Sequence, residues 1–297
     1  MTRRTPKPDR DAPIGVFDSG VGGLTVVSAL LRYLPNESIL YLGDTARLPY
    51  GTKSPQTVAR YTERNVRFLV NRGVKAVVVA CNTASALSAS VLSAGPGLGG
   101  PAVPIWPDGP AVPIWGVVEP GAAAAVAAVR RGPVGVLATE STIRSGAYEA
   151  AIRGHRPDLT ALGRPCPLFV PLVEEGWVDD PISEAVARRY LEPLLAAEVD
   201  TLVLGCTHYP LLTPVLRRVV GEGVALVDSA ESVALRIRDE LPRLGLGREA
   251  PADGGRHHLC VTDPSERFQR IAHRLLHHFH TADHDLEESV SLEWVEV

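Results

Sequence analysis

The stretch AVVVACNTAS, residues 76–85, joins a short run of β-branched residues to a polar segment that can begin a helix. Because the run is short and rich in valine, it predicts a buried strand that ends next to Cys81. A helix is expected just before it, with Ser54 as its cap, Pro55 in its first turn and Gly73 at its end. This order of helix, strand and helix is typical of parallel α/β proteins.

Similar apolar runs recur along the chain and alternate with amphipathic stretches. They occupy residues 14–17, 39–42, 134–138, 201–205 and 224–228. The run IGVFDS ending at Ser19 can be laid over VGVLAT ending at Thr139, and AVVVAC ending at Cys81 over TLVLGC ending at Cys206. We therefore predict an α/β fold with two similar doubly wound parallel-sheet lobes. The active site is expected in the cleft between them, since such sheets bind ligands at the carboxyl ends of their strands.

Length and charge exclude several classes of protein. The chain has 297 residues, and its 30 basic and 34 acidic side chains leave a net charge of −4. Nucleic acid is not favoured as a partner, because phosphate binding needs a basic surface. No stretch approaches the roughly 18 apolar residues of a spanning helix, and the N-terminus lacks the apolar core of a secretion signal. The protein is therefore not expected to attach to a membrane. Four cysteines are too few for a disulfide scaffold, so a reducing cytoplasm is expected.

Two cysteines stand at equivalent strand ends, where they could carry chemistry. A helix beginning at Asn82 or Thr83 would place the Cys81 thiol near a positive helix end and favour its thiolate. Cys206 comes shortly before His208, with which it could share a proton. A single cysteine after a strand is more often a small core residue, but the matched pair favours a reactive role.

Further polar groups follow other strands. Asp18 and Ser19 begin the glycine-rich turn FDSGVGG, whose spacing fits neither GxGxxG nor a P-loop. Its amides are better suited to a carboxylate than to a nucleotide, although tight packing alone would also explain the glycines. The polar loop at 41–51 either belongs to the site or is simply a turn. Glu174 and Glu175 either reach the cleft or remain solvated.

The remaining cysteines and histidines are expected to be structural. Cys166 and Cys260 have no evident polar company. Seven of the nine histidines follow residue 256, including His273 and His277 one helical turn apart. Because no HExxH-like spacing accompanies them, a solvated helix face is expected and no metal is assigned. The tandem copy of GPAVPIW within 100–115 is expected to be a surface loop insertion.

Seven motifs together resemble those of the glutamate racemases in the aspartate/glutamate racemase superfamily. In chain order they are FDSGVGGLTV, YLGDTARLPYG, ACNTASA, GVVEPG, TIRSGAY, VPLVEEG and LGCTHYPLL. The resemblance implies two α/β lobes and the interconversion of L- and D-glutamate without a cofactor. The family's two catalytic cysteines carry over onto Cys81 and Cys206, the first acting on D-glutamate and the second on L-glutamate. It further implies a supply of D-glutamate for peptidoglycan and makes a homodimer plausible.

The resemblance also implies roles for other residues. Asp18 would assist Cys81, His208 would assist Cys206, and Glu174 would orient His208. The implied substrate contacts are Asp18, Ser19, Tyr50, Gly51, Asn82, Thr83, Thr139, Thr207 and His208. The expected organisation is a first lobe from 14–118 and 229–280 and a second lobe over 119–228, with a disordered tail over 1–13 and a flexible tail over 281–297 that lie outside the resemblance.

Four other functions are compatible with the residues to different degrees. A racemase of the same superfamily that acts on aspartate would keep both cysteines. A pyridoxal-phosphate racemase needs a Schiff-base lysine, and the chain has only Lys7, Lys53 and Lys75. An amino-acid-binding protein with inert cysteines would bind glutamate without exchanging its α-proton. A thiol-disulfide protein is disfavoured because the chain has no CxxC motif.

Overall fold

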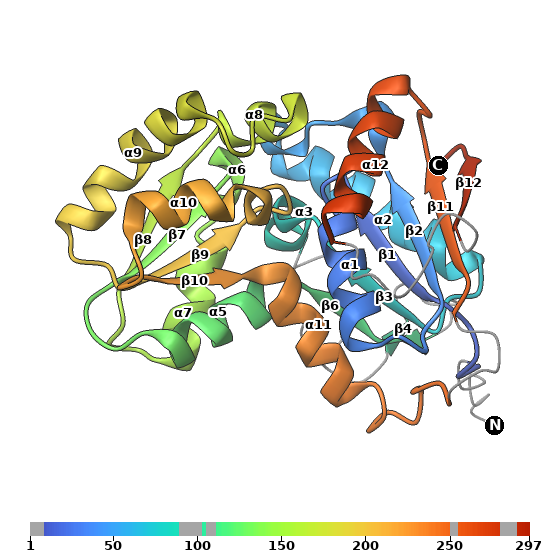
Figure 1. The fold of residues 1–297 in the computed structure, drawn as a ribbon. Helices are drawn as coiled ribbons and strands as arrows, with labels where there is room; N and C mark the ends of the chain where they lie inside the picture. Colours follow the sequence, from blue (N-terminus) through green and yellow to red (C-terminus); the bar gives the residue numbers. More distant parts are fainter. Residues whose placement is uncertain (1–8, 89–102, 105–110, 250–254, 280–289) are drawn as a thin grey trace.

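The strands of the protein form two parallel sheets, one in each lobe (Figure 1). The computed structural model describes residues 9–88, 103–104, 111–249, 255–279 and 290–297. The first sheet has the order β12-β11-β2-β1-β3-β6 and the second the order β10-β9-β7-β8. A separate antiparallel pair, β4 and β5, lies next to the first sheet.

The strands have the following bounds. The first sheet contains β1 (Ile14–Asp18), β2 (Ile39–Gly43), β3 (Ala76–Val79), β6 (Ile114–Gly116), β11 (His257–Val261) and β12 (Val290–Trp294). The second contains β7 (Val134–Ala138), β8 (Ala161–Pro165), β9 (Thr201–Gly205) and β10 (Ala225–Asp228), and the short pair is β4 (Val103–Pro104) and β5 (Ala111–Val112). Every pairing within the two large sheets is parallel, as the alternating sequence pattern predicts.

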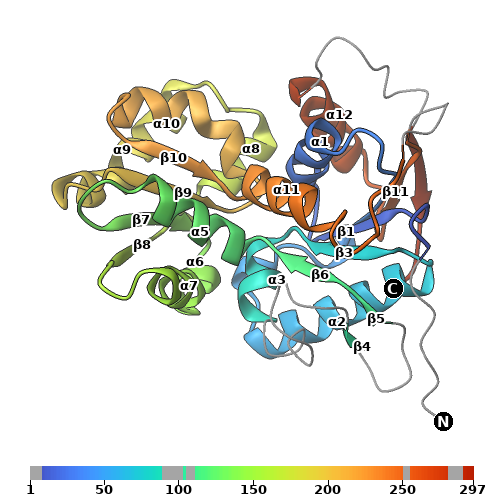
Figure 2. The same ribbon diagram turned by 90° about the horizontal axis from the view of Figure 1, so that it is seen from below.

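Helices cover both faces of each sheet. They are α1 (Leu24–Tyr33), α2 (Pro55–Asn71), α3 (Asn82–Leu87), α5 (Val118–Ala128), α6 (Glu140–Arg144), α7 (Ala147–His155), α8 (Phe169–Glu175), α9 (Pro181–Ala196), α10 (Thr213–Val220), α11 (Ser229–Glu240) and α12 (Glu266–Phe279). Short 3-10 turns η1 (Thr45–Arg47), η2 (Tyr50–Thr52) and η3 (Tyr209–Leu212) follow strand ends. Helix α11 lies between the lobes and packs on both α1 and α5 (Figure 2).

Helix α2 illustrates why the local sequence folds as it does. The Ser54 hydroxyl accepts a hydrogen bond from the Thr57 amide, Pro55 occupies the first turn, and Gly73 follows the helix with φ of 79°. Val58, Val66 and Leu69 lie on the face that it buries against the first sheet. The capping and termination that the sequence predicts for this helix are therefore confirmed.

The two sheets repeat the same strand order and the same register. Strands β2-β1-β3-β6 of the first correspond to β8-β7-β9-β10 of the second. Ile14 lies opposite Ala76 in the first sheet, and Val134 lies opposite Thr201 in the second. These are the positions that the sequence alignment matches, so the similarity of the two lobes is confirmed.

The predicted tails differ from the structure in their described parts. Residues 1–8 lie outside those parts, but Arg10 is fixed, because its carbonyl accepts a hydrogen bond of 2.6 Å from Lys75 Nζ. The prediction of a flexible tail over 281–297 is wrong for its end, since Val290–Trp294 forms β12 and pairs with β11. The alternation of Val290, Leu292 and Trp294 with polar residues is the strand signal that was missed. The exact limits of the two lobes stay a prediction.

Among the described residues, no helix has the length and apolar character needed to cross a bilayer.

Candidate active site

The central strands of both sheets end in polar residues that meet at the junction of the lobes. Strand β1 leads to Ser19, β3 to Cys81, β7 to Thr139 and β9 to Cys206. Hydrogen bonds join the two sets, among them Thr83 to Thr139 at 3.0 Å between hydroxyl oxygens. The carboxyl ends of the two sheets thus lie together, as the sequence predicts.

The first cysteine is buried at the start of α3. The Cys81 sulfur lies 3.4 Å from the Ser19 hydroxyl and 3.5 Å from the Ala84 amide nitrogen, which donates to it. Burial and then the negative charge of Asp18 raise the pKa of the Cys81 thiol to about 12, against the opposing effect of these two hydrogen bonds. The helix end lowers this pKa through the Ala84 amide, as expected, but desolvation outweighs it, so the thiol and not the thiolate is favoured.

The second cysteine lies in a chain of three polar side chains. The Cys206 sulfur is 3.9 Å from His208 Nδ1, and His208 Nε2 is 3.5 Å from Glu174 Oε1 at the end of α8. Burial alone would lower the pKa of the His208 imidazole, but Cys206 and Glu174 outweigh it and raise the pKa to about 10. His208 therefore carries a positive charge at neutral pH beside the Cys206 sulfur.

This arrangement predicts how stability responds to pH in Glu174→Gln. Without the carboxylate, the pKa of His208 should fall by about one unit, since a nearby opposite charge typically shifts a pKa by one to three. A raised histidine pKa stabilises the fold fully below the unfolded value of 6.5 and ceases to do so as pH rises through about 10. The variant should therefore lose most stability relative to the parent at acidic pH and little at high pH.

Histidine NMR titration and denaturant unfolding at several pH values measure the two effects. Glu175→Gln is the matched control, because the adjacent Glu175 is exposed, whereas Glu174 is one of the groups that raise the pKa of His208. Equal titration of His208 in both variants would contradict the assigned pairing.

Asp18 and the glycine turn bring the two lobes into close contact. The buried Asp18 carboxylate accepts a hydrogen bond of 2.9 Å from the Gly20 amide and lies 3.5 Å from the Thr207 hydroxyl. A Cβ at Gly22 would stand 2.4 Å from Thr207 Oγ1 and 2.5 Å from the His208 ring. Glycine at position 22 is therefore what allows the first turn to approach the Cys206 loop.

Threonine hydroxyls form a second bridge between the lobes. Thr83, Thr139 and Thr142 lie within 3.0 to 3.2 Å of one another through their Oγ1 atoms. Gly51 packs against this group, because a Cβ there would lie 3.0 Å from Thr139 Cβ, and its carbonyl accepts a 2.6 Å hydrogen bond from Ser141. These hydroxyls can donate to an anionic ligand at the junction.

Asn82 is held by two residues that the sequence did not single out. Its Nδ2 donates to the Tyr148 hydroxyl at 2.8 Å and to the Ser229 hydroxyl at 3.2 Å. Its buried Oδ1 has no hydrogen-bond partner among the described residues. Tyr148 lies within the motif TIRSGAY, but the motif gives no signal that its hydroxyl reaches Asn82.

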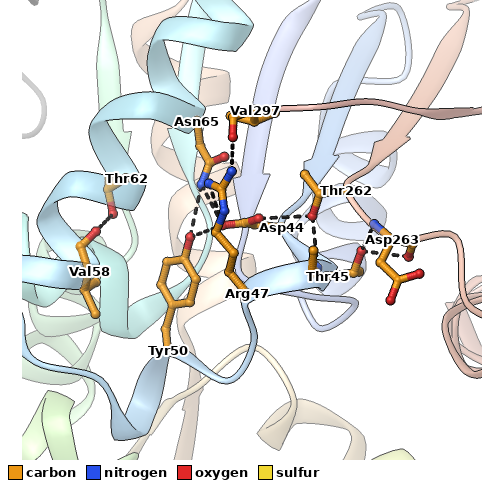
Figure 3. A network of polar contacts seen from close by, with 11 residues as sticks. Asp44, Thr45, Arg47, Tyr50, Val58, Thr62, Asn65, Thr262, Asp263 and Val297 are labelled. Atoms are coloured by element: carbon orange, nitrogen blue, oxygen red, sulfur yellow. Dashed lines mark hydrogen bonds and ion pairs between the residues drawn. The ribbon is translucent and has the colours of Figure 1, made fainter.

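Tyr50 belongs to a buried network around Asp44 (Figure 3). The Tyr50 hydroxyl donates to the Asp44 carboxylate, and Asn65 donates to both at 3.1 and 3.3 Å. Thr262 donates to the second Asp44 oxygen at 3.0 Å. Burial raises the pKa of the Tyr50 phenol far above its ordinary value, so it is a neutral group in this network. Its hydroxyl is thus bound to Asp44, and its ring packs against the rings of Phe17 and Tyr61.

The remaining chemical groups lie apart from this junction. All four cysteines are free thiols. Lys75 stands at the amino end of β3, opposite to Cys81, and forms an ion pair with Glu37. The expectation that Cys166 and Cys260 lack polar company is wrong, because the Cys166 sulfur donates to the Arg164 carbonyl at 3.4 Å and the Cys260 sulfur lies 3.8 Å from Glu293. Of the histidine-rich segment after residue 270, only His273 has a described environment and it is exposed.

Known proteins share both the sequence and the fold. The family model described as Asp/Glu/Hydantoin racemase matches residues 14–237. A glutamate racemase of Geobacter metallireducens is 49% identical over 89% of this chain and 92% of its own length. The crystal structure of a glutamate racemase from Bacillus anthracis is 34% identical, with a TM-score of 0.84 over 97% of this chain and 99% of that one.

A third relative was solved with a ligand. The glutamate racemase of Francisella tularensis, in complex with D-glutamate, is 32% identical, with a TM-score of 0.82 over 97% of this chain and 98% of that one. The fold and the match over most of the chain define a racemase, and the chain belongs to the Asp/Glu/hydantoin racemase family. Within that family, each of these three relatives is a glutamate racemase.

Proposed function

We propose that the protein is a glutamate racemase that uses Cys81 and Cys206 as its two acid-base groups. The observation that carries the proposal is the pair of free thiols at equivalent strand ends of two repeated lobes. Racemisation needs one group to remove the α-proton and another to deliver a proton to the opposite face. Two thiols contributed by facing lobes meet this requirement, and the similar proteins are named as glutamate racemases.

In each direction of the reaction, one sulfur takes the α-proton from the substrate and the other sulfur gives a proton to Cα. Starting from L-glutamate, the Cys206 thiolate removes the α-proton, and the electron pair left on Cα is delocalised into the α-carboxylate. The Cys81 thiol then protonates the opposite face to give D-glutamate, and the reverse reaction exchanges the two roles. Because the raised pKa of Cys81 keeps it protonated at neutral pH and His208 is cationic beside Cys206, this starting state agrees with the charges of the site.

The polar groups of the junction suit the three charged groups of glutamate. Thr83 and Thr139 offer hydroxyl donors for a carboxylate, and Thr207 and the amides after Ser19 offer a second set. The buried Oδ1 of Asn82 is a free acceptor suited to the α-ammonium group. We assign Asp18 to positioning near Cys81, Glu174 to orienting His208, and Tyr50 and Gly51 to the wall beside Thr139.

Asn82→Ala should therefore weaken substrate binding more than it slows chemistry. Loss of one hydrogen bond to a charged group costs about 1.5 to 3 kcal/mol, so KM should rise about tenfold or more. Steady-state kinetics with both enantiomers measure this change. Tyr148→Phe is the companion variant, because it removes a group that holds Asn82 but leaves Oδ1 in place, and a KM effect as large as that of Asn82→Ala would argue against direct binding by Oδ1.

Incubation with L-glutamate in D2O, without added cofactor, tests the activity itself. Loss of optical rotation together with deuterium at Cα establishes racemisation, whereas binding without exchange would identify an amino-acid-binding protein. Parallel incubation with L-aspartate decides the substrate, since both cysteines would serve either acid. We expect turnover of glutamate to exceed that of aspartate.

The same proposal covers the setting of the enzyme. The D-glutamate formed would enter peptidoglycan precursor synthesis, and the four free thiols suit a reducing cytoplasm. Glutamate is the partner proposed, with no nucleic acid and no membrane. A homodimer is an expectation that size measurement in solution would decide.

A further inference from the structure

A second cluster of reactive side chains lies at the far edge of the first sheet. Strands β11 and β12 are parallel, with His258 opposite Ser291 and Cys260 opposite Glu293. Because side chains two residues apart share one face of a strand, these four project to the same side. Cys260 is fully buried there, whereas the His258 and Glu293 side chains are 35% and 38% exposed.

The three potential ligand atoms of this cluster converge. The sulfur of Cys260, a ring nitrogen of His258 and a carboxylate oxygen of Glu293 all lie within 4.8 Å of one another. The separations are 2.7 Å from His258 Nε2 to Glu293 Oε2 and 3.8 Å from the Cys260 sulfur to the same oxygen. A tetrahedral zinc site, with bonds of about 2.0 to 2.3 Å, requires ligand atoms about 3.3 to 3.8 Å apart.

We propose that Cys260, His258 and Glu293 bind a divalent cation of the zinc class, with water as a fourth ligand. The thiolate, imidazole and carboxylate donors are those that zinc takes in proteins. The Cys260 thiol releases its proton to solvent when the metal binds. His258 and Glu293 must separate by about 0.6 Å or more to admit the ion, and their partial exposure leaves them room to do so.

Neighbouring groups prepare these ligands for a metal. Ser291 is hydrogen-bonded to His258 Nδ1, which fixes the ring and leaves Nε2 as the ligand nitrogen. Arg72 donates to Glu293 Oε1 at 2.7 Å, which leaves Oε2 directed to the cluster. With the thiolate and carboxylate ionised and Arg72 charged, the cluster carries one net negative charge, which favours a divalent cation.

The metal would join two strands that the chain brings together from distant positions. His258 and Cys260 belong to β11, and Glu293 belongs to the edge strand β12. A metal that binds only the folded protein raises the free energy of unfolding, and at metal concentrations above Kd this increase grows with the logarithm of the metal concentration. The site is thus structural and separate from the junction that holds Cys81 and Cys206.

Cobalt(II) in place of zinc provides the test, because a thiolate ligand produces a sulfur-to-cobalt charge-transfer band that imidazole and carboxylate cannot. The full-length protein should carry Cys81→Ala and Cys206→Ala, so that the thiols of the junction contribute no such band. Cobalt bound by the histidine-rich segment gives none either. We expect a charge-transfer band that saturates with one cobalt per chain and disappears when zinc is added.

Variants in this background assign the ligands. Cys260→Ser should abolish the band. His258→Gln and Glu293→Gln should each weaken cobalt binding by at least about 100-fold, because loss of a group that only hydrogen-bonds to a metal ligand already costs up to about 100-fold. Ser291→Ala should weaken it about tenfold. Cys166→Ser is the matched control, since Cys166 is buried in the other lobe, and it should keep the band.

Two results would overturn the proposal. One is the absence of a charge-transfer band in the folded parent, which would leave the cluster as an ion-pair network of Arg72, His258 and Glu293. The other is a band that persists in Cys260→Ser. If Cys260→Ser fails to fold, as far-ultraviolet circular dichroism would reveal, the half-exposed His258→Gln and Glu293→Gln decide the question through cobalt affinity alone.

Discussion

Cys81→Ala and Cys206→Ala should each reduce the interconversion of glutamate enantiomers by at least about 10³-fold, within the range that a positioned acid or base contributes. Each variant removes the group on one face of Cα and leaves the other in place. We expect no other described thiol to substitute, because Cys166 follows the edge strand β8 and Cys260 lies within β11, away from the ends of β3 and β9. The loss should appear in kcat for both directions, since every turnover uses both sulfurs.

Isotope labelling distinguishes this mechanism from one with a single base. In D2O the parent enzyme should place deuterium in the product enantiomer before the remaining substrate acquires it, because the delivering thiol has exchanged with solvent. Polarimetry and proton NMR follow the two quantities in one sample. Cys166→Ala is the control and should remain within a few-fold of the parent. Full activity in either junction variant would refute the two-thiol proposal.

Gly22→Ala should reduce kcat about 100-fold, because a displacement of about 1 Å at the reacting groups can have that effect. The added methyl would overlap the Thr207 hydroxyl and the His208 ring, both buried. These atoms must move, and His208 would shift relative to Cys206. Crowding of this kind also destabilises a core by about 1 to 3 kcal/mol.

Gly20→Ala provides the comparison within the same turn. A Cβ at position 20 would meet only Leu48 Cδ2, at 3.5 Å, which is an ordinary contact. Its amide can still donate to Asp18, so its loss of activity should be at least tenfold smaller than that of Gly22→Ala. Kinetics and denaturant unfolding on the two variants make the comparison. Equal losses would show that the turn tolerates no side chain at all, rather than being limited by its approach to the Cys206 loop.

The sequence predicts the frame of the site because that frame depends on local patterns. Runs such as 76–80 and 201–205 are short, apolar and followed by polar residues, so they locate the strand ends and both cysteines. The matching register of the two sheets follows from the same runs. These properties depend only on the periodicity and spacing of apolar residues along the chain.

What the sequence could not predict depends on contacts between distant residues. Tyr148 and Ser229 hold Asn82 from positions 66 and 147 residues away, so no local pattern reveals them. The protonation of Cys81 reflects burial and the charge of Asp18, which outweigh a helix end that was visible in the sequence. Strand β12 was missed for another reason, since its alternating residues follow a long polar segment that resembles a tail.

The two sheets with their matched register hold the two sulfurs at equivalent strand ends, although the surroundings of the two sulfurs differ. L- and D-glutamate are mirror images with the same free energy in water, so the equilibrium constant between them is unity. The Haldane relation then requires the same kcat/KM in both directions, however differently the two sulfurs are surrounded. Asp18 near one sulfur and His208 near the other can therefore change kcat and KM differently in the two directions, but the ratio kcat/KM must stay equal in both. A duplicated lobe is well suited to a reaction whose two ends are thermodynamically indistinguishable.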